Sequence, residues 1–85
     1  MHVNTDECLA AGLDPTEVAR IAKGLSRYAK QADKLGITIF GGSGAGTLRF
    51  DDCQGGRLVV ASLDGDFDGG DGAEEEDDEG LLRGE

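Results

Sequence analysis

The chain has 85 residues with 18 acidic and eight basic side chains, and 13 of the acidic residues lie in residues 51–85 beside only Arg57 and Arg83. This third of the chain carries a net charge of about −11 and the first fifty residues about +1, which indicates a protein that selects a charged partner. The length excludes a second domain, the net charge of −10 argues against direct nucleic-acid binding, and two cysteines are too few for a disulfide framework.

Two helices are predicted at the start of the chain. Asn4 or Thr5 can cap a short helix that ends near Ala11, before Gly12. Asp14 and Pro15 give a stronger start signal, with an N-cap followed by proline at the first helical position. Apolar residues then recur at helical spacing until Gly36, so a long amphipathic helix is expected over residues 15–35. Its apolar stripe comprises Val18, Ile21, Leu25, Tyr28, Ala32 and Leu35.

Three strands are predicted after Gly36, because the apolar period changes from 3.6 to 2. They cover residues 37–40, 47–50 and 58–63 and are joined by glycine-containing loops that suit hairpins. The expected fold class is α+β, with a short N-terminal helix and one long amphipathic helix packed on a three-stranded antiparallel β-meander. Residues 1–63 would form this small domain, and residues 64–85 an acidic, flexible C-terminal loop and tail.

The glycine-rich loop at residues 41–46 has the composition of a phosphate-binding loop but lacks its context. A Walker motif would end in Gly-Lys-Ser/Thr, and a dinucleotide-binding loop would open a helix, whereas a strand follows here. The loop is therefore expected to be a flexible hairpin connection. A contact loop for a protein partner is the alternative.

A calcium-binding loop is one interpretation of the Asp/Gly-rich segment at residues 64–75. Numbered as a twelve-residue EF-hand-type loop, the segment has Asp at positions 1, 3 and 5, Gly at 6 and Glu at 12. Position 8 is Asp71 rather than an aliphatic residue, and a strand precedes the loop where an EF-hand has a helix. No cofactor is otherwise expected. The candidate metal ligands are Asp64, Asp66, Asp68, Gly70 and Glu75.

A helix-turn-helix regulator that binds DNA is a second alternative. Residues 8–21 fit the pattern in outline, with Cys8 at the small-residue position and Gly12 in the turn. The long helix also has a line of basic residues on the side away from its apolar stripe, which comprises Arg20, Lys23, Arg27, Lys30 and Lys34. The short first helix, the lack of a third helix and the net charge all argue against DNA recognition.

Enzymatic activity is not expected. The sole histidine, His2, lies near the N-terminus, and no Ser/His/Asp or Cys/His set can be assembled from folded positions. No secretory signal or membrane-spanning segment is found, so a cytoplasmic protein without membrane contact is expected. A homodimer is left open by the exposed edges of a small sheet.

At class level the chain resembles small acidic inhibitor proteins of bacteriophages and mobile elements, among them anti-CRISPR proteins and other DNA mimics. The resemblance depends on the size, the helix-plus-meander pattern and the acidic stretch from Asp64 through Glu79. It implies an inhibitor that occupies the nucleic-acid site of a host nucleoprotein complex.

The function expected from the sequence is therefore non-enzymatic binding to a basic surface of a nucleic-acid-handling partner. Phe67 is the expected apolar anchor, and carboxylates supply the electrostatics. An alternative role for the same acids is autoinhibitory contact with the basic line of the long helix. The candidate partner-binding residues are Asp64, Asp66, Phe67, Asp68, Asp71, Glu74, Glu75, Glu76, Asp77, Asp78 and Glu79.

Overall fold

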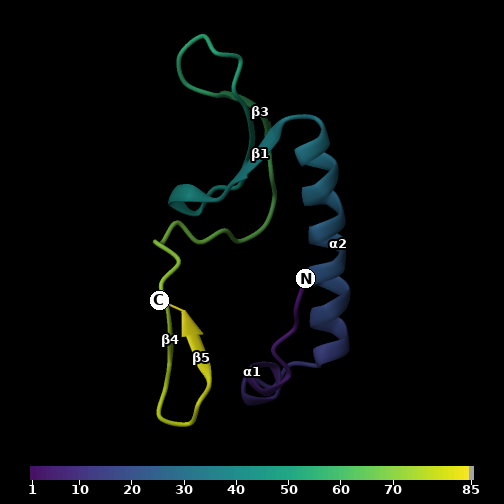
Figure 1. Cartoon of the computed structure of the whole chain (residues 1–85), viewed down its shortest axis with the longest axis vertical. Helices are drawn as coiled ribbons and strands as arrows, with labels where there is room; N and C mark the ends of the chain where they lie inside the picture. The colour runs from purple at the N-terminus through teal and green to yellow at the C-terminus, as the bar shows by residue number, and fades with distance from the viewer. Residues whose placement is uncertain (85) are drawn as a thin grey trace. The chain divides into compact units, whose positions relative to one another are not determined.

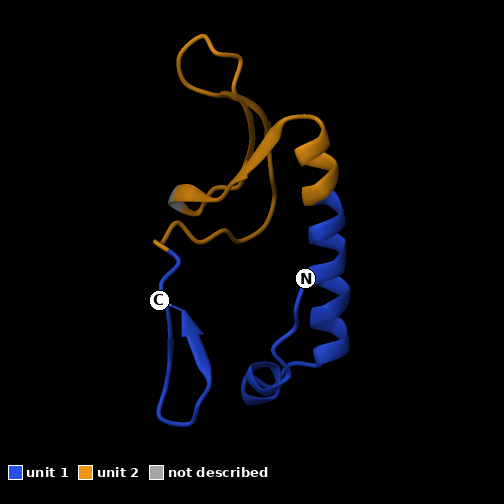
Figure 2. Cartoon of the chain, in the orientation of Figure 1, with its two compact units in different colours: residues 1–28, 72–85 blue, residues 29–71 orange. Residues whose placement is uncertain are grey.

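A computed structural model describes residues 1–84, which form an α+β structure of two helices, a three-stranded antiparallel sheet and a two-stranded sheet (Figure 1). The chain divides into two compact units (Figure 2). Unit 1 comprises Met1–Tyr28 and Gly72–Glu85, and unit 2 comprises Ala29–Asp71. The predicted division into residues 1–63 and 64–85 rests on composition and stays a prediction.

The short helix α1 (Thr5–Ala10) forms where the sequence predicted it. Asn4 is its N-cap residue in extended conformation, and Gly12 has a φ of +74°, as expected for a left-handed helix stop. The backbone N–H of Leu13 then donates to the carbonyl of Cys8 at 2.8 Å. Cys8 is 7% exposed and is the one buried hydrophobic residue among residues 1–84.

The long helix α2 (Pro15–Lys34) also confirms its prediction, since it begins at the expected proline and ends one residue early. The Asp14 carboxylate accepts a hydrogen bond from the backbone N–H of Thr16 at 2.9 Å, which satisfies one of the free donors of the first turn. Gly36, with a φ of +75°, lets the chain leave the helix and enter the first strand.

The predicted β-meander is confirmed in unit 2. Its strands are β1 (Ile37–Phe40), β2 (Thr47–Phe50) and β3 (Leu58–Ser62), in the order β1-β2-β3 with antiparallel neighbours. Thr38 lies opposite Arg49 and Phe40 opposite Thr47, so these four residues share one face of the sheet. A register shift between Leu48 and Arg49 marks a β-bulge in the pairing with β3.

The glycine-rich loop is a packed turn in the structure rather than an open connection. It contains one turn of 3₁₀-helix, η1 (Gly42–Gly44), and the buried Gly46 follows it. A Cβ placed on Gly46 would lie 2.5 Å from ring atoms of Phe67. The space that Gly46 leaves is therefore filled by the Phe67 ring, which holds the segment after β3 against the loop.

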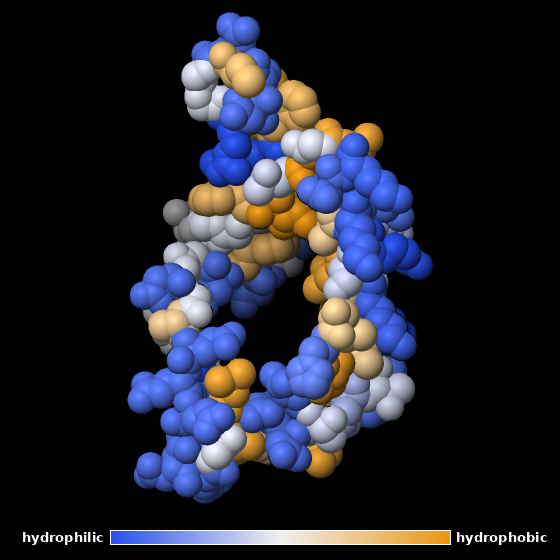
Figure 3. All heavy atoms as spheres, in the orientation of Figure 1, coloured by the Kyte–Doolittle hydropathy of each residue, from blue (hydrophilic) through white to orange (hydrophobic). Residues whose placement is uncertain are grey.

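The apolar stripe of α2 is not buried. No residue of α2 falls in the buried class, and Ile21, Leu25 and Tyr28 are 56%, 66% and 60% exposed. The predicted packing of this helix on the β-meander is therefore not found, because the side chains that would make the contact are exposed. Figure 3 accordingly shows hydrophobic residues at the surface.

A second sheet, which the sequence did not predict, lies in the acidic C-terminal segment. Strands β4 (Glu74–Glu76) and β5 (Leu82–Gly84) pair as an antiparallel hairpin in unit 1.

Neither described helix is long and apolar enough to cross a membrane.

Candidate partner-binding surface

The acidic hairpin, defined here as residues 74–84, contains six consecutive acidic residues and one arginine, for a net charge of −5. Glu74 lies opposite Gly84, Glu75 opposite Arg83 and Glu76 opposite Leu82. The remaining acids, Asp77, Asp78 and Glu79, lie in the turn between the strands. The hairpin therefore presents a concentrated negative charge on regular backbone structure.

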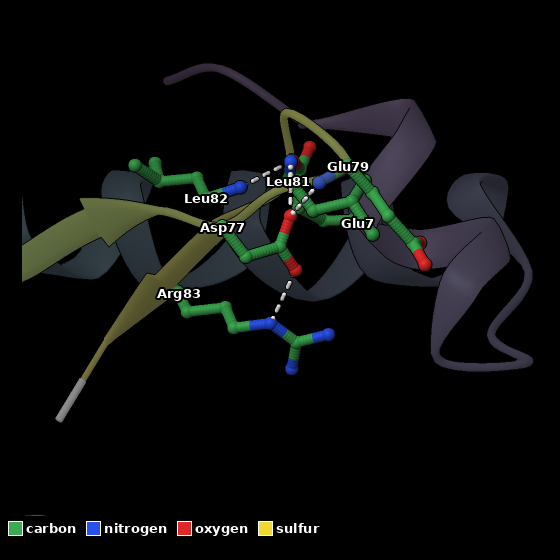
Figure 4. A network of polar contacts seen from close by, with 6 residues as sticks. All are labelled: Glu7, Asp77, Glu79, Leu81, Leu82 and Arg83. Carbon is green, nitrogen blue, oxygen red and sulfur yellow. Dashed lines mark hydrogen bonds and ion pairs between the residues drawn. The ribbon is translucent and has the colours of Figure 1, made fainter.

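Asp77 organises the turn of the acidic hairpin (Figure 4). One carboxylate oxygen accepts the backbone N–H groups of Glu79 and Leu81 at 2.9 and 3.0 Å. The other accepts Nε of Arg83 at 2.6 Å, and the backbone N–H of Asp77 donates to the carbonyl of Leu81 at 2.9 Å. The Arg83 hydrogen bond and then that from Leu81 lower the pKa of Asp77 below its ordinary value of 3.8.

Asp77 thus has a structural role that the sequence analysis did not assign. Its side chain is 22% exposed, whereas the other five acids of the run belong to exposed residues. The position of Gly80 in the sequence could have indicated this role. Gly80 has a φ of +78°, and an Asp three residues before such a glycine can accept backbone N–H groups of the turn, here those of Glu79 and Leu81.

Glu7 connects the acidic hairpin to α1 within unit 1. Its carboxylate accepts the backbone N–H of Leu82 at 2.8 Å, a contact between residues 75 positions apart (Figure 4). A pocket of about 360 Å³ lies at this junction, lined by Glu7, Ala10, Ala11 and residues 81–84. Leu81 is half-buried and lines this pocket, so the hydrogen bond from Leu82 to Glu7 is the contact that links the hairpin to α1 here.

The Asp ladder, defined as Asp64, Asp66, Asp68 and Asp71, lies in unit 2 and is separate from the acidic hairpin in this division. All four residues are exposed. Phe67 is half-buried against Gly41 and Gly46, so it anchors its own segment on the glycine-rich loop. The contact of Phe67 with a partner, which the sequence suggested, stays a prediction.

The candidate calcium ligands are distributed over both units. Asp64, Asp66, Asp68 and Gly70 precede the boundary at residue 71, and Glu75 lies in β4 opposite Arg83. The Asp68 carboxylate accepts the backbone N–H of Gly70 at 2.9 Å. Among residues 1–84 no three His, Cys, Asp or Glu side chains are grouped closely enough to hold a metal ion. Calcium binding by residues 64–75 stays a prediction.

The elements of the helix-turn-helix alternative are present as α1, the turn at Gly12 and α2. The first helix has only six residues. On the basic line of α2, Arg20 forms an ion pair with Glu17 at 2.7 Å, and Arg27 lies 4.9 Å from the ring centre of Tyr28. DNA recognition, and the contact of this line with the acidic segment, also stay predictions.

No protein-family model, curated protein or solved structure matches this chain.

Proposed function

We propose that the chain is a non-enzymatic binding protein whose acidic hairpin occupies a basic surface on a nucleic-acid-handling partner and inhibits or regulates that partner. The observation that carries the proposal is the pairing of the acidic run into a hairpin fixed by Asp77 and Glu7. The proposed class is that of small phage-type inhibitors with DNA-mimic electrostatics.

The charge spacing along β4 supports mimicry of nucleic acid. Residues in a strand advance by about 3.3 Å, so Glu74, Glu75 and Glu76 carry one negative charge per about 3.3 Å. One strand of B-DNA carries one phosphate charge per about 3.4 Å of helix axis. Because successive glutamates alternate between two faces, a basic groove on one face of β4 would meet Glu74 and Glu76, about 6.6 Å apart, and a groove that contacts both faces would meet all three charges.

The fixed backbone also supports binding, because side chains on an ordered hairpin lose less conformational entropy on association than those on a disordered tail. Most of the carboxylates remain available, since Glu74, Glu75, Glu76, Asp78 and Glu79 are all exposed. The hairpin can thus keep its structure through Asp77 while the exposed acids contact basic groups on the partner.

Charge neutralisation in the full-length chain tests the proposal better than truncation, since removing residues 64–85 would also remove part of unit 1. The test variant is E74Q/E75Q/E76Q. The matched control, D64N/D66N/D68N, removes the same number of charges from the Asp ladder. Each Asn retains one side-chain oxygen as a hydrogen-bond acceptor. Both variants and the parent chain would be immobilised and incubated with nuclease-treated bacterial extract.

The expected result is a specific nucleic-acid-binding protein that the parent and the control recover and the Gln variant does not. Added duplex DNA should displace this protein from the parent chain, because both compete for the same basic surface. Equal recovery by the Gln variant and the control, or recovery that DNA leaves unchanged, would refute the role of the acidic hairpin.

A further inference from the structure

Two arginines gather on one face of the sheet in unit 2, far along the sequence from the acidic hairpin. Cζ of Arg49 lies 4.0 Å from the ring centre of Phe40, and Cζ of Arg57 lies 5.8 Å from the same centre. Phe40 is on β1, Arg49 on β2, and Arg57 directly precedes β3. Strands β1 and β2 and the residue just before β3 therefore bring two positive charges to a single aromatic ring.

The residues that the strand register places beside Phe40 and Arg49 on this face are mostly hydroxyl-bearing, and Val59 lies opposite Arg49. Register places Thr38 opposite Arg49, Thr47 opposite Phe40, and Ser62 opposite Thr47. We call this set the guanidinium face; it comprises Thr38, Phe40, Thr47, Arg49, Arg57 and Ser62. The ion pairs found among residues 1–84, Arg20–Glu17 and Arg83–Asp77, involve neither of its arginines.

The Arg49 side chain is half-buried and is held by two contacts within the sheet. Its Nε donates to Oγ1 of Thr47 at 3.0 Å, and its plane lies against the Phe40 ring. These contacts leave the two terminal NH₂ groups, which together can bind two oxygens of one anion. Stacking and the Thr47 bond thus orient Arg49 before any ligand arrives.

The two guanidiniums lie within about 10 Å of each other, because both distances are measured to one ring centre. The separation is therefore no larger than about the Debye length of about 8–10 Å at physiological ionic strength, so salt does not fully screen the repulsion between the two like charges. An anion bound between them would relieve this repulsion. A dianion fits better than a carboxylate, since it can neutralise both charges and accept from the nearby hydroxyls.

We propose that the guanidinium face binds a dianionic phosphate group, as found in inorganic phosphate and small phosphate monoesters. A nucleic-acid strand is disfavoured as the ligand, because each phosphodiester carries one charge and the chain as a whole carries −10. This site is independent of the partner proposed for the acidic hairpin. Either proposal can fail while the other stands.

Titration of the full-length chain with inorganic phosphate at pH 7.5, followed by amide NMR shifts, tests the site. Saturable shifts at Thr38, Thr47 and Arg49 with a millimolar dissociation constant are expected, and sodium chloride at equal ionic strength should not produce them. R49Q and R57Q should each weaken phosphate binding about tenfold. R49K should weaken it as well, since lysine keeps the charge but loses the planar fork.

R27Q is the matched control, because Arg27 also lies over an aromatic ring but belongs to unit 1, whereas the guanidinium face belongs to unit 2. It should leave phosphate affinity unchanged. The amide spectra report directly whether each variant remains folded. Shifts that fail to saturate, that chloride reproduces, or that R27Q reduces as much as R49Q would overturn the proposal. Acetate or a single-stranded oligonucleotide binding as tightly as phosphate would overturn the choice of a dianionic phosphate.

Discussion

The Asp77 carboxylate accepts a 2.6 Å hydrogen bond from Nε of Arg83, across the turn of a hairpin that contains no other basic residue. The same carboxylate also holds the backbone N–H groups of Glu79 and Leu81. One acid and one arginine are thus used to fold the turn, and five exposed acids remain without this structural duty. Within the acidic run, Asp77 therefore stabilises the turn, and the other five acids are exposed and can contact a partner.

Replacing Asp77 with Asn should loosen the hairpin turn. Asn retains one acceptor oxygen for the turn N–H groups but loses the charge that attracts Arg83. We expect faster amide hydrogen exchange at Glu79 and Leu81 with little change in β1–β3. The matched control D78N removes the same charge from the neighbouring exposed residue. Equal effects of D77N and D78N would contradict the assigned role.

Acidification should open the same turn. Hydrogen bonds to the carboxylate lower the pKa of Asp77 in the folded hairpin relative to 3.8, so the folded state binds its proton less readily than the open state. The stabilisation is fully present above pH 3.8 and is lost as pH falls through the lowered pKa. Amide shifts of Leu81 and Arg83 between pH 6 and pH 2 would show this, and the transition should be absent in D77N. A midpoint above 3.8 would contradict the prediction.

Replacing Glu7 with Ala should detach the hairpin from α1. The Leu82 N–H would lose its acceptor at 2.8 Å, at a cost of about 1 kcal/mol in local stability. E7Q should be nearly neutral, because its amide oxygen can accept the same bond. D6A serves as the control for charge, since it removes a neighbouring exposed acid. Hydrogen exchange at Leu82 is the measurement, and unchanged exchange in E7A would count against this contact.

Replacing Gly46 with Ala should destabilise unit 2. The new methyl group would meet the Phe67 ring at 2.5 Å, and forcing the ring aside should cost about 1–3 kcal/mol. The double variant G46A/F67L should recover part of this loss, because the two positions are in contact and their effects are not additive.

Gly24 provides the control for the Gly46 substitution, since a Cβ there meets nothing within 4 Å and the residue lies inside α2. G24A should stabilise the chain by about 0.5–1 kcal/mol. Urea unfolding of the four proteins measures these differences. If G46A were as stable as the parent, the packing of the Phe67 ring would not require a glycine at position 46, which would contradict the prediction.

Local signals predicted the secondary structure of residues 1–63 well. Pro15 and Gly36 marked both ends of α2 to within a residue, and the alternation of apolar residues located β1, β2 and β3. These signals depend on a few neighbouring residues, so they are readable from the sequence. The predicted burial of the apolar stripe of α2 was wrong, since Ile21 and Leu25 are exposed. Burial of this stripe depends on tertiary packing, which local signals do not reveal.

The hairpin formed by β4 and β5 could not be predicted in the same way. Glutamate has low strand propensity, and six adjacent acids are typical of a solvated tail. Its stability comes from Asp77 bound to Arg83 and from Glu7 bound to Leu82, a pair 75 residues apart. Likewise, the glycine-rich loop looked flexible because its packing partner, Phe67, lies 21 residues beyond Gly46 in the chain.

The most direct test is the affinity of the captured partner, measured at salt concentrations from about 50 to about 300 mM. Three proteins are compared: the parent chain, E74Q/E75Q/E76Q and D64N/D66N/D68N. The slope of affinity against salt reports how many charges the contact neutralises. We expect the affinity of the partner for the parent chain to fall steeply with salt, and duplex DNA to compete for binding. The Gln variant should bind more weakly at low salt and show a shallower salt dependence, while the control should follow the parent. Equal affinity and salt dependence for the parent and the Gln variant would contradict the claim that the acidic hairpin binds the partner.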